Sequence, residues 1–313
     1  MRVGMLVTGG TEATGITRAL ERLFPGHEFP VIYENRRDRR TFHGFTSNRV
    51  PPPQARAPTS VESIAKAAVA HLFLNINGDQ PPDFLVVLDD LELCNVGNER
   101  GVADTFSAAV GAHLDELKTD NSMKFVKRYE DAVRDRLSLH LVKPMIEAWF
   151  FADPKALEAA GVPQNAPVVV DQNQDPECFC TTDADYRNAT DASCPCLNEL
   201  PKARRRTQKP KWLGTEFKRE THPKGYLQWL LLAPNKESCT RYHETRDGGR
   251  ALACLDWSRL SDRPDGHVLF FRSLVADLAD ALGEAPSTGP VKLKEADVTS
   301  LSQRPKDHVI RNL

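Results

Sequence analysis

A run of apolar residues that ends in carboxylates is the stretch of this chain best suited to chemistry. Residues 83–93 read DFLVVLDDLEL, so the apolar run is followed at once by Asp89, Asp90 and Glu92. Like charges at such short separation repel unless a proton neutralises one of them or they share a divalent cation. We therefore expect a catalytic or Mg²⁺-binding centre here. The alternative is that these acids cap the following turn or pair with surface arginines.

The elements that must position these acids follow a β-α-β-α-β order. Helical spacing of apolar residues separates short apolar runs, which is typical of a mostly parallel sheet with helices on both faces. Strands are expected at 2–8, 29–33, 83–93 and 137–142. Thr59 and Glu62 have the spacing of a capping box at the start of the helix that leads into residues 83–93.

Glu12 is the second acidic component of the expected site. It follows the first predicted strand across the turn formed by Gly9 and Gly10. Ligands of parallel α/β sheets bind beyond the carboxyl ends of the strands, where Glu12, Asp89, Asp90 and Glu92 should meet. Carboxylate oxygens suit Mg²⁺, or Mn²⁺ in its place, and a substrate phosphate would complete the coordination.

Four of the seven cysteines suggest a second metal site, for zinc. Cys178, Cys180, Cys194 and Cys196 form two C-x-C pairs thirteen residues apart, in a stretch without apolar periodicity. Four thiolates close in sequence can complete a tetrahedral structural Zn²⁺ site. Free surface thiols in a variable loop are the alternative.

Basic residues concentrate between Lys202 and Lys224, where nine Lys or Arg accompany two Glu, with aromatic residues interleaved or adjacent. Such a segment can follow a phosphate backbone while the aromatic rings stack on bases. A solvated loop, or a patch for an acidic partner, is the equal alternative. The candidate substrate-binding residues are Arg204, Arg205, Arg206, Lys209, Lys211, His222, Lys224, Arg241 and Arg246.

The segment IEAWFFAD, residues 146–153, combines core and charged residues. Its aromatic residues are expected in the core. Glu147 and Asp153 lie inside an apolar run, so each needs a partner, which the acidic site or an arginine of RYHETRDGGR would provide. Tyr242 of that stretch is a further candidate near the substrate phosphate.

The whole chain has the composition of an ordinary globular protein. Its 313 residues carry a formal charge of −2, so contact with nucleic acid requires a local patch. We find no export signal or membrane-spanning run and expect a cytoplasmic protein with reduced cysteines. The expected divisions are an α/β core, a Cys-rich and basic insertion, a helical part that completes the domain, and a tail that orders against a partner: residues 1–160, 161–211, 212–283 and 284–313.

A dinucleotide-binding fold is a minor alternative. The stretch VTGGTEATGITRAL is similar to the glycine-rich turn of short-chain dehydrogenases, and Glu34 stands about where a ribose-binding acid would follow the second strand. However, the middle glycine is replaced by Ala13, and no tyrosine has a lysine four residues away. An NAD(P)-dependent oxidoreductase is therefore the weakest of the functional hypotheses.

Five motifs in order resemble TOPRIM-like proteins encoded beside AAA or ABC-type ATPases in bacterial defence loci. They are the glycine turn with Thr11 and Glu12, DFLVVLDDLE, PMIEAWFFAD, HPKGYL and RYHETRDGGRAL. The resemblance implies a TOPRIM-type α/β fold, Mg²⁺-dependent phosphodiester hydrolysis and an ATPase partner. Carried over, Asp89 and Asp90 are metal ligands, Glu92 is an auxiliary ligand, and Glu147 is a further acid near the site.

The chain departs from that family at its first acidic position. Many relatives have an acidic residue directly at the end of the first strand, where this chain has Thr8, which leaves Glu12 as the nearby carboxylate. If Glu12 reaches the metal, we expect a nuclease or nucleic-acid-binding subunit of an anti-phage defence system. Otherwise we expect a non-catalytic adaptor that docks onto a partner. DNA or RNA preference and oligomeric state do not follow from the sequence.

Overall fold

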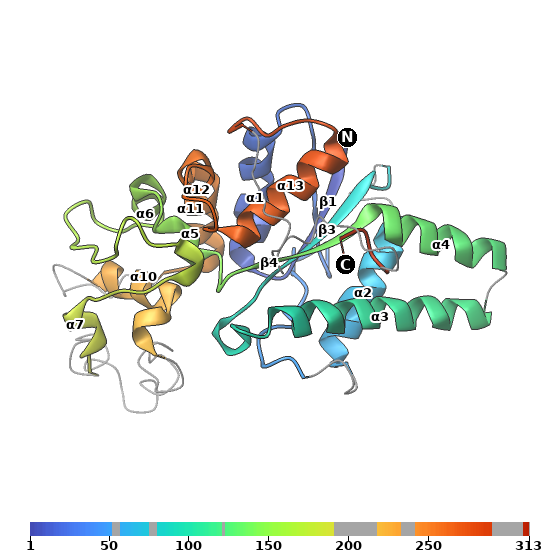
Figure 1. Cartoon of the computed structure of the whole chain (residues 1–313), viewed down its shortest axis with the longest axis horizontal. Helices are drawn as coiled ribbons and strands as arrows, with labels where there is room; N and C mark the ends of the chain where they lie inside the picture. The colour runs from blue at the N-terminus through green and yellow to red at the C-terminus, as the bar shows by residue number, and fades with distance from the viewer. Residues whose placement is uncertain are drawn as a thin grey trace.

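The structure is a computed structural model of the whole chain. It describes residues 1–51, 57–74, 80–120, 123–190, 218–232, 242–289 and 309–312. The described elements form a central parallel sheet with long helices on both faces, and a group of shorter helices beyond one end of the sheet (Figure 1).

The sheet has four parallel strands in the order β2-β1-β3-β4. These strands are β1 Val3–Val7, β2 Val31–Ile32, β3 Phe84–Asp90 and β4 Leu137–Val142. Successive side chains of a strand point to opposite faces, and in β3 both sets are apolar: Val86 and Leu88 join one core cluster, Leu85 and Val87 the other. A continuous apolar run is therefore what this central strand requires.

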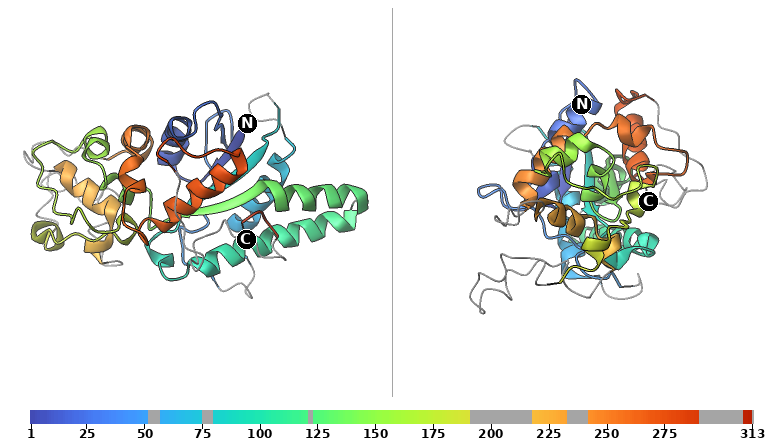
Figure 2. Two further views of the ribbon diagram at one scale, coloured as in Figure 1. Left: turned by 45° about the horizontal axis from the view of Figure 1, so that its top comes forward. Right: turned by 90° about the vertical axis from the view of Figure 1, so that its left-hand side faces the viewer.

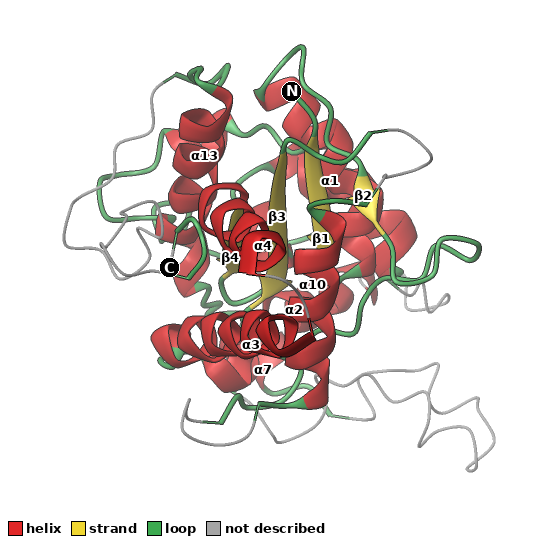
Figure 3. Ribbon diagram, turned by 90° about the vertical axis from the view of Figure 1, so that its right-hand side faces the viewer, coloured by secondary structure: helices red, strands yellow, loops and turns green. Residues whose placement is uncertain are grey.

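Helices cover both faces of the sheet, as the periodicity predicts (Figure 3). Helices α1 Gly10–Leu23 and α13 Leu269–Leu282 contribute to one core cluster, and α2 Thr59–His71 and α3 Glu99–Asp120 to the other. Helix α4 Met123–Arg136 runs beside α3, and the pair projects away from the shorter helices (Figure 2). In the part of the chain that the structure describes, no helix has both the length and the apolar character needed to cross a membrane.

The shorter helices gather beyond the carboxyl ends of the strands (Figure 1). They pack around the aromatic residues of IEAWFFAD, and Trp149 makes edge contacts with Trp257 and Phe271 at centroid distances of 6.0 and 5.6 Å. The predicted core role of this segment is thus confirmed. The helices are α5 Glu147–Phe150, α6 Pro154–Ala159, α7 Ala184–Arg187, α10 Pro223–Leu232, α11 Gly249–Cys254 and α12 Ser258–Ser261. Single 3₁₀ turns occur at Leu93–Asn95, Pro176–Cys178 and Arg219–Thr221, and a π-helical turn occurs at Glu244–Gly248.

Two local predictions were wrong or incomplete, and one helix was not predicted. The Thr59–Glu62 capping box does not form, because Pro58 is the N-cap of α2 and the N–H groups of Val61 and Glu62 donate to its carbonyl. Helix α4 was not predicted, since its sequence MKFVKRYEDAVRDR is mostly charged, although Val126, Tyr129 and Val133 do have helical spacing. The strand at 29–33 is shorter than expected, with only Val31 and Ile32 in β2.

The end of the chain docks onto the exposed edge of the sheet. The Arg311 N–H donates to the Leu137 carbonyl at 2.8 Å, and the Asn312 side chain exchanges two hydrogen bonds with the backbone of Leu139. Ile310 is fully buried. For residues 309–312 the expectation of a tail ordered by a partner is therefore wrong, because β4 of the same chain offers an unpaired backbone edge.

Candidate functional site

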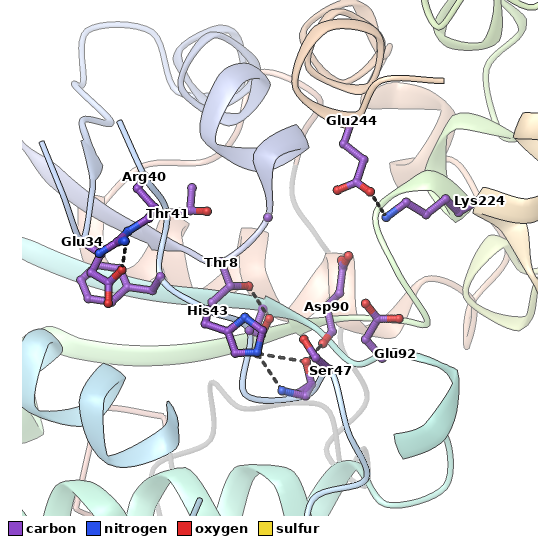
Figure 4. A pocket seen from close by; sticks show the side chains of 15 residues that line it. Thr8, Glu34, Arg40, Thr41, His43, Ser47, Asp90, Glu92, Lys224 and Glu244 are labelled. Carbon is purple, nitrogen blue, oxygen red and sulfur yellow. Dashed lines mark hydrogen bonds and ion pairs between the residues drawn. The ribbon is translucent and has the colours of Figure 1, made fainter. Parts of the chain in front are cut away.

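A cavity of about 550 Å³ opens at the carboxyl ends of β1 and β3 (Figure 4). Its walls come from segments far apart in sequence, namely the ends of both strands, the loop after β2, the first turn of α10, and the turn Glu244–Gly248. The lining residues are Thr8, Gly9, Glu34, Arg40, Thr41, Phe42, His43, Gly44, Thr46, Ser47, Asp89, Asp90, Glu92, Lys224 and Glu244. The cavity thus lies where a parallel sheet is expected to bind a ligand.

Glu12 lies in the first turn of α1 and is 3% exposed. Its carboxylate folds back over Gly9 so closely that a Cβ atom at Gly9 would clash with it. Burial and the nearby Glu147 raise the pKa of Glu12 to about 8, against the lowering effect of a backbone hydrogen bond. The glycine turn is therefore needed to admit a carboxylate at this helix start.

Asp90 and Glu92 lie at the end of β3. Asp90 Oδ1 accepts a hydrogen bond of 2.9 Å from the Ile146 N–H, while burial and the charges of Glu12 and Glu147 raise its pKa well above the ordinary value. Burial and Glu147 likewise raise the pKa of Glu92 to about 7, although Lys224 opposes the shift. Glu92 also has φ 61° and ψ 150°, a backbone conformation that is costly for a residue other than glycine. Such strain is characteristic of functional sites.

Glu147 connects the acidic cluster to a tyrosine and a lysine. Its Oε1 accepts from the Tyr242 hydroxyl at 2.9 Å and lies 3.8 Å from Lys224 Nζ, which also pairs with Glu244 at 2.7 Å. The pKa of Lys224 is raised because Glu147 and Glu244 outweigh the effect of burial. The second oxygen, Glu147 Oε2, is buried and has no hydrogen-bond partner among the described residues. An unpartnered buried carboxylate oxygen is costly, and a bound water or a cation would satisfy it.

A pair of glycines brings Tyr242 to this cluster. Gly248 is the N-cap of α11 and Gly249 is its first residue, and Cβ atoms there would collide with the Tyr242 hydroxyl and with Thr11 and Thr14 of α1. Helix α11 therefore packs directly on α1. The glycines of the motif RYHETRDGGRAL thus allow the close helix packing that places its polar residue Tyr242 at the cluster.

Asp89 makes a different set of contacts from the other acids. Its Oδ1 accepts from the Thr8 hydroxyl, and its Oδ2 accepts from the Phe45 N–H at 3.1 Å and from the Thr46 hydroxyl at 3.0 Å. Burial still raises the pKa of Asp89 to about 6. Both oxygens are therefore occupied by donors of the chain itself, and Asp89 holds the loop after β2 against the end of β3.

The acidic cluster has the donor chemistry of a divalent-cation site without a preassembled ligand set. In the described ranges, no three His, Cys, Asp or Glu side chains already stand as a group that could hold a metal ion. The orphaned Glu147 Oε2, next to Glu12, Asp90 and Glu92, nevertheless fits an oxygen-seeking cation such as Mg²⁺. Binding would require these carboxylate side chains to rotate toward one another.

Three residues from the sequence predictions have other contacts. Asp153 caps α6 through the Lys155 N–H at 3.0 Å and accepts from the Asp256 N–H, so its partners are backbone groups and not the acidic site. Arg246 binds the neighbouring Asp247 at 2.7 Å and does not line the cavity. His222 Nδ1 accepts from the Gly225 N–H at 3.1 Å, which caps the start of α10. The phosphate-binding roles predicted for Arg246 and His222 gain no support from this geometry.

Other predicted residues lie outside the described ranges. Cys178 and Cys180 are exposed free thiols near the turn Pro176–Cys178, and the zinc site stays a prediction because its other two cysteines are not described. The same holds for most of the basic candidates. The residues concerned are Cys194, Cys196, Arg204, Arg205, Arg206, Lys209, Lys211 and Arg241.

Sequence reasoning missed His43, Ser47 and Glu244, all of which line the cavity. His43 and Ser47 belong to the long loop after β2, for which the sequence indicates a function only through the length of the loop and its arginine cluster, Arg36, Arg37, Arg39 and Arg40. Glu244 belongs to a recognised motif, but only the packing of α11 on α1 shows that it faces Lys224.

Comparisons with protein-family models, with curated proteins and with solved structures found no match to this chain. The functional argument therefore rests on the cavity and its residues. That geometry weighs against a dinucleotide site, because the Glu12 carboxylate at the start of α1 puts negative charge where a pyrophosphate would lie.

Proposed function

We propose that the protein binds a divalent cation, Mg²⁺ or Mn²⁺, through the acidic cluster and hydrolyses phosphodiester bonds of nucleic acid. The observation that carries the proposal is the buried, unpartnered Glu147 Oε2 among Glu12, Asp90 and Glu92. Lys224 and these acids share the cluster, and one lysine is too little positive charge for four carboxylates. A site of this kind selects for a ligand that brings positive charge.

Each residue of the cluster would have its own role in cation binding and hydrolysis. Glu12, Asp90, Glu92 and Glu147 would hold the ion, which when bound polarises a phosphate oxygen and lowers the pKa of a bound water. Tyr242 orients Glu147 through its 2.9 Å hydrogen bond. Lys224, at the cavity wall, places a positive charge where negative charge develops on a phosphate during hydrolysis. The resemblance adds an ATPase partner, cytoplasmic anti-phage defence and a TOPRIM-type fold to the proposal.

Two variants test the proposal directly. Asp90→Asn and Glu147→Gln keep the shape of each side chain but remove its charge, whereas Asp265→Asn changes an exposed acid outside the cavity and serves as the control. We expect the first two to lower Mg²⁺-dependent cleavage by about a thousandfold or more, equivalent to about 4 kcal/mol. The control should cleave like the wild type.

The measurement uses plasmid, single-stranded DNA and RNA with Mg²⁺, with Mn²⁺ and with EDTA. Binding of Mn²⁺ is followed separately by the loss of the free-ion electron paramagnetic resonance signal. Equal cleavage by Asp90→Asn and the wild type would refute the site assignment. The same substrates are then offered together with an ATPase partner, once one is identified.

A non-catalytic adaptor is the second candidate function. It is favoured by the contact between Thr8 and Asp89, which uses an acid of the family motif to hold a loop. An adaptor predicts that the wild type cleaves none of these nucleic acids with any metal, whether or not an ATPase is present.

A further inference from the structure

The loop after β2 forms one wall of the cavity, next to the end of β3 (Figure 4). Besides its bonds to Asp89, it is held by Asn95, whose side chain donates to the Thr46 carbonyl at 2.8 Å and accepts from the Val50 N–H at 2.8 Å. Phe45 is buried and stacks on Phe106 of α3 at 5.9 Å. An exposed loop without a function would not need anchors from both β3 and α3.

The side chains that this loop presents to the cavity differ in charge from the acidic residues at the end of β3. Arg40 and His43 line the wall together with the hydroxyls of Thr41 and Ser47. The Glu34 carboxylate pairs with Arg40 Nε at 2.9 Å and so orients the guanidinium. Asp89, Asp90, Glu92 and Glu244 also line the cavity, with Lys224 paired to Glu244. The cavity is therefore divided between donors of the loop after β2 and carboxylates from the end of β3 and the turn Glu244–Gly248.

A ligand that fits this division has negative charge toward the donors and meets the carboxylates through a cation. We propose that Arg40, His43 and Ser47 bind the phosphate group of a nucleotide unit, with Arg40 as the main charged contact. This inference rests on the proposed function, because the cation of the acidic cluster is what lets a phosphate approach it. A volume of about 550 Å³ accommodates a nucleotide and exceeds what inorganic phosphate needs.

The same loop supplies a matched control. Arg36 and Arg37 are exposed arginines four and three residues before Arg40, and neither lines the cavity. The pair Arg36→Gln with Arg37→Gln removes two guanidinium charges, whereas Arg40→Gln with His43→Gln removes one guanidinium charge and one imidazole. If only the overall charge of the loop mattered, the variant with Arg36→Gln and Arg37→Gln would bind more weakly than the variant with Arg40→Gln and His43→Gln. If Arg40 and His43 contact the phosphate directly, the variant with Arg40→Gln and His43→Gln would be the weaker binder.

The experiment measures fluorescence anisotropy of a labelled six-nucleotide single-stranded DNA with the full chain, in Ca²⁺ and again in EDTA. We expect Arg40→Gln with His43→Gln to weaken binding about tenfold or more in Ca²⁺, and the control pair to change it by about twofold or less. His43→Gln alone should give a smaller loss in the same direction. Thermal unfolding of each variant confirms that it is folded.

Equal weakening by both pairs, no weakening by the Arg40 and His43 pair, or no binding by the wild type would overturn the inference. Inorganic phosphate that competes as well as the unlabelled oligonucleotide would overturn the assignment of a nucleotide and leave a free-phosphate site. Failure of the proposed function has a different signature, namely no Mn²⁺ binding and no cleavage by a wild type that still binds the oligonucleotide.

Discussion

Two groups of buried or half-buried carboxylates in this molecule differ in the partners that surround them. At the edge of the sheet, Asp277 of α13 receives hydrogen bonds of 3.0 Å from both His140 of β4 and Arg311 of the docked C-terminal segment. At the carboxyl ends of the strands, Glu12, Asp90, Glu92 and Glu147 share mainly one lysine. Asp277 thus has enough positively charged or hydrogen-bonding partners, whereas the four acids at the strand ends have too few.

The pKa values express this difference with opposite signs. For Asp277 the hydrogen bond and charge of His140 and the charge of Arg311 outweigh burial, so its pKa is lowered. For Glu12 and Glu92 burial and like charges prevail, and their pKa values rise to about 8 and about 7. Buried acids with partners stabilise the fold, whereas buried acids without them indicate a ligand.

The largest effect on stability should come from neutralising an acid of the paired group. Asp277→Asn leaves the buried Arg311 without its full partner, and we expect the free energy of unfolding to fall by about 3–5 kcal/mol. Glu147→Gln, measured without metal, should change it by less than about 1 kcal/mol, because relief of the repulsion from neighbouring carboxylates offsets the weakened contacts with Tyr242 and Lys224. Urea unfolding at pH 7 measures both. Equal destabilisation would erase the distinction between the two groups.

The pH dependence of stability should also separate the groups. A carboxyl group whose pKa is raised on folding contributes stability at low pH that is lost as pH rises from its ordinary value, near 4.5, through about 8 for Glu12. Between pH 5.5 and 8.5, without metal, the free energy of unfolding should fall by about 1–3 kcal/mol.

Two controls sharpen this prediction. Glu12→Gln should flatten the decline, and Mg²⁺ should reverse it increasingly toward pH 8.5. The contribution of Asp277 has the opposite sign, since its lowered pKa makes stability fall only as the pH drops below about 4. A profile that is flat from pH 5.5 to 8.5 would show that the acids of the cluster are compensated after all.

Removing the one lysine of the cluster should have an intermediate effect. Without metal at pH 8, Lys224→Met should lower the free energy of unfolding by about 1–2 kcal/mol, because Glu147 and Glu244 lose a cation. At pH 5.5 the loss should be smaller, since more carboxyls are protonated. Chemical unfolding at the two pH values makes the comparison, with the exposed Lys155→Met as control. A loss independent of pH would mean that Lys224 acts by packing.

The smallest effect is expected at Thr8. Thr8→Val removes the hydroxyl that donates to Asp89 while keeping the branched shape, and should cost about 1 kcal/mol. The loop after β2 should then exchange its amide hydrogens faster, most clearly at Phe45, whose N–H donates to Asp89. Hydrogen exchange measures this change. Unchanged exchange at Phe45 would show that Asp89 alone is sufficient to hold the loop.

The sequence by itself determined the elements and the edge of the sheet where the site lies. Apolar runs and helical spacing are local properties, so they predicted β1, β3 and β4 and the helix α2 that leads into β3. The rule that ligands meet parallel strands at their carboxyl ends then placed Glu12 near Asp90. Helix α4 was missed because charged residues dominate its sequence, although its few apolar residues do have helical spacing.

Only the tertiary structure decided how the acids are used. Asp89 and Asp90 are adjacent and chemically identical in the sequence, yet Asp89 holds a loop while Asp90 faces Glu12 and Glu147. The difference arises because neighbouring side chains of a strand point to opposite sides and meet different partners. Those partners, Thr46 for Asp89 and Lys224 for the cluster, come from distant parts of the chain, and no local pattern specifies such contacts.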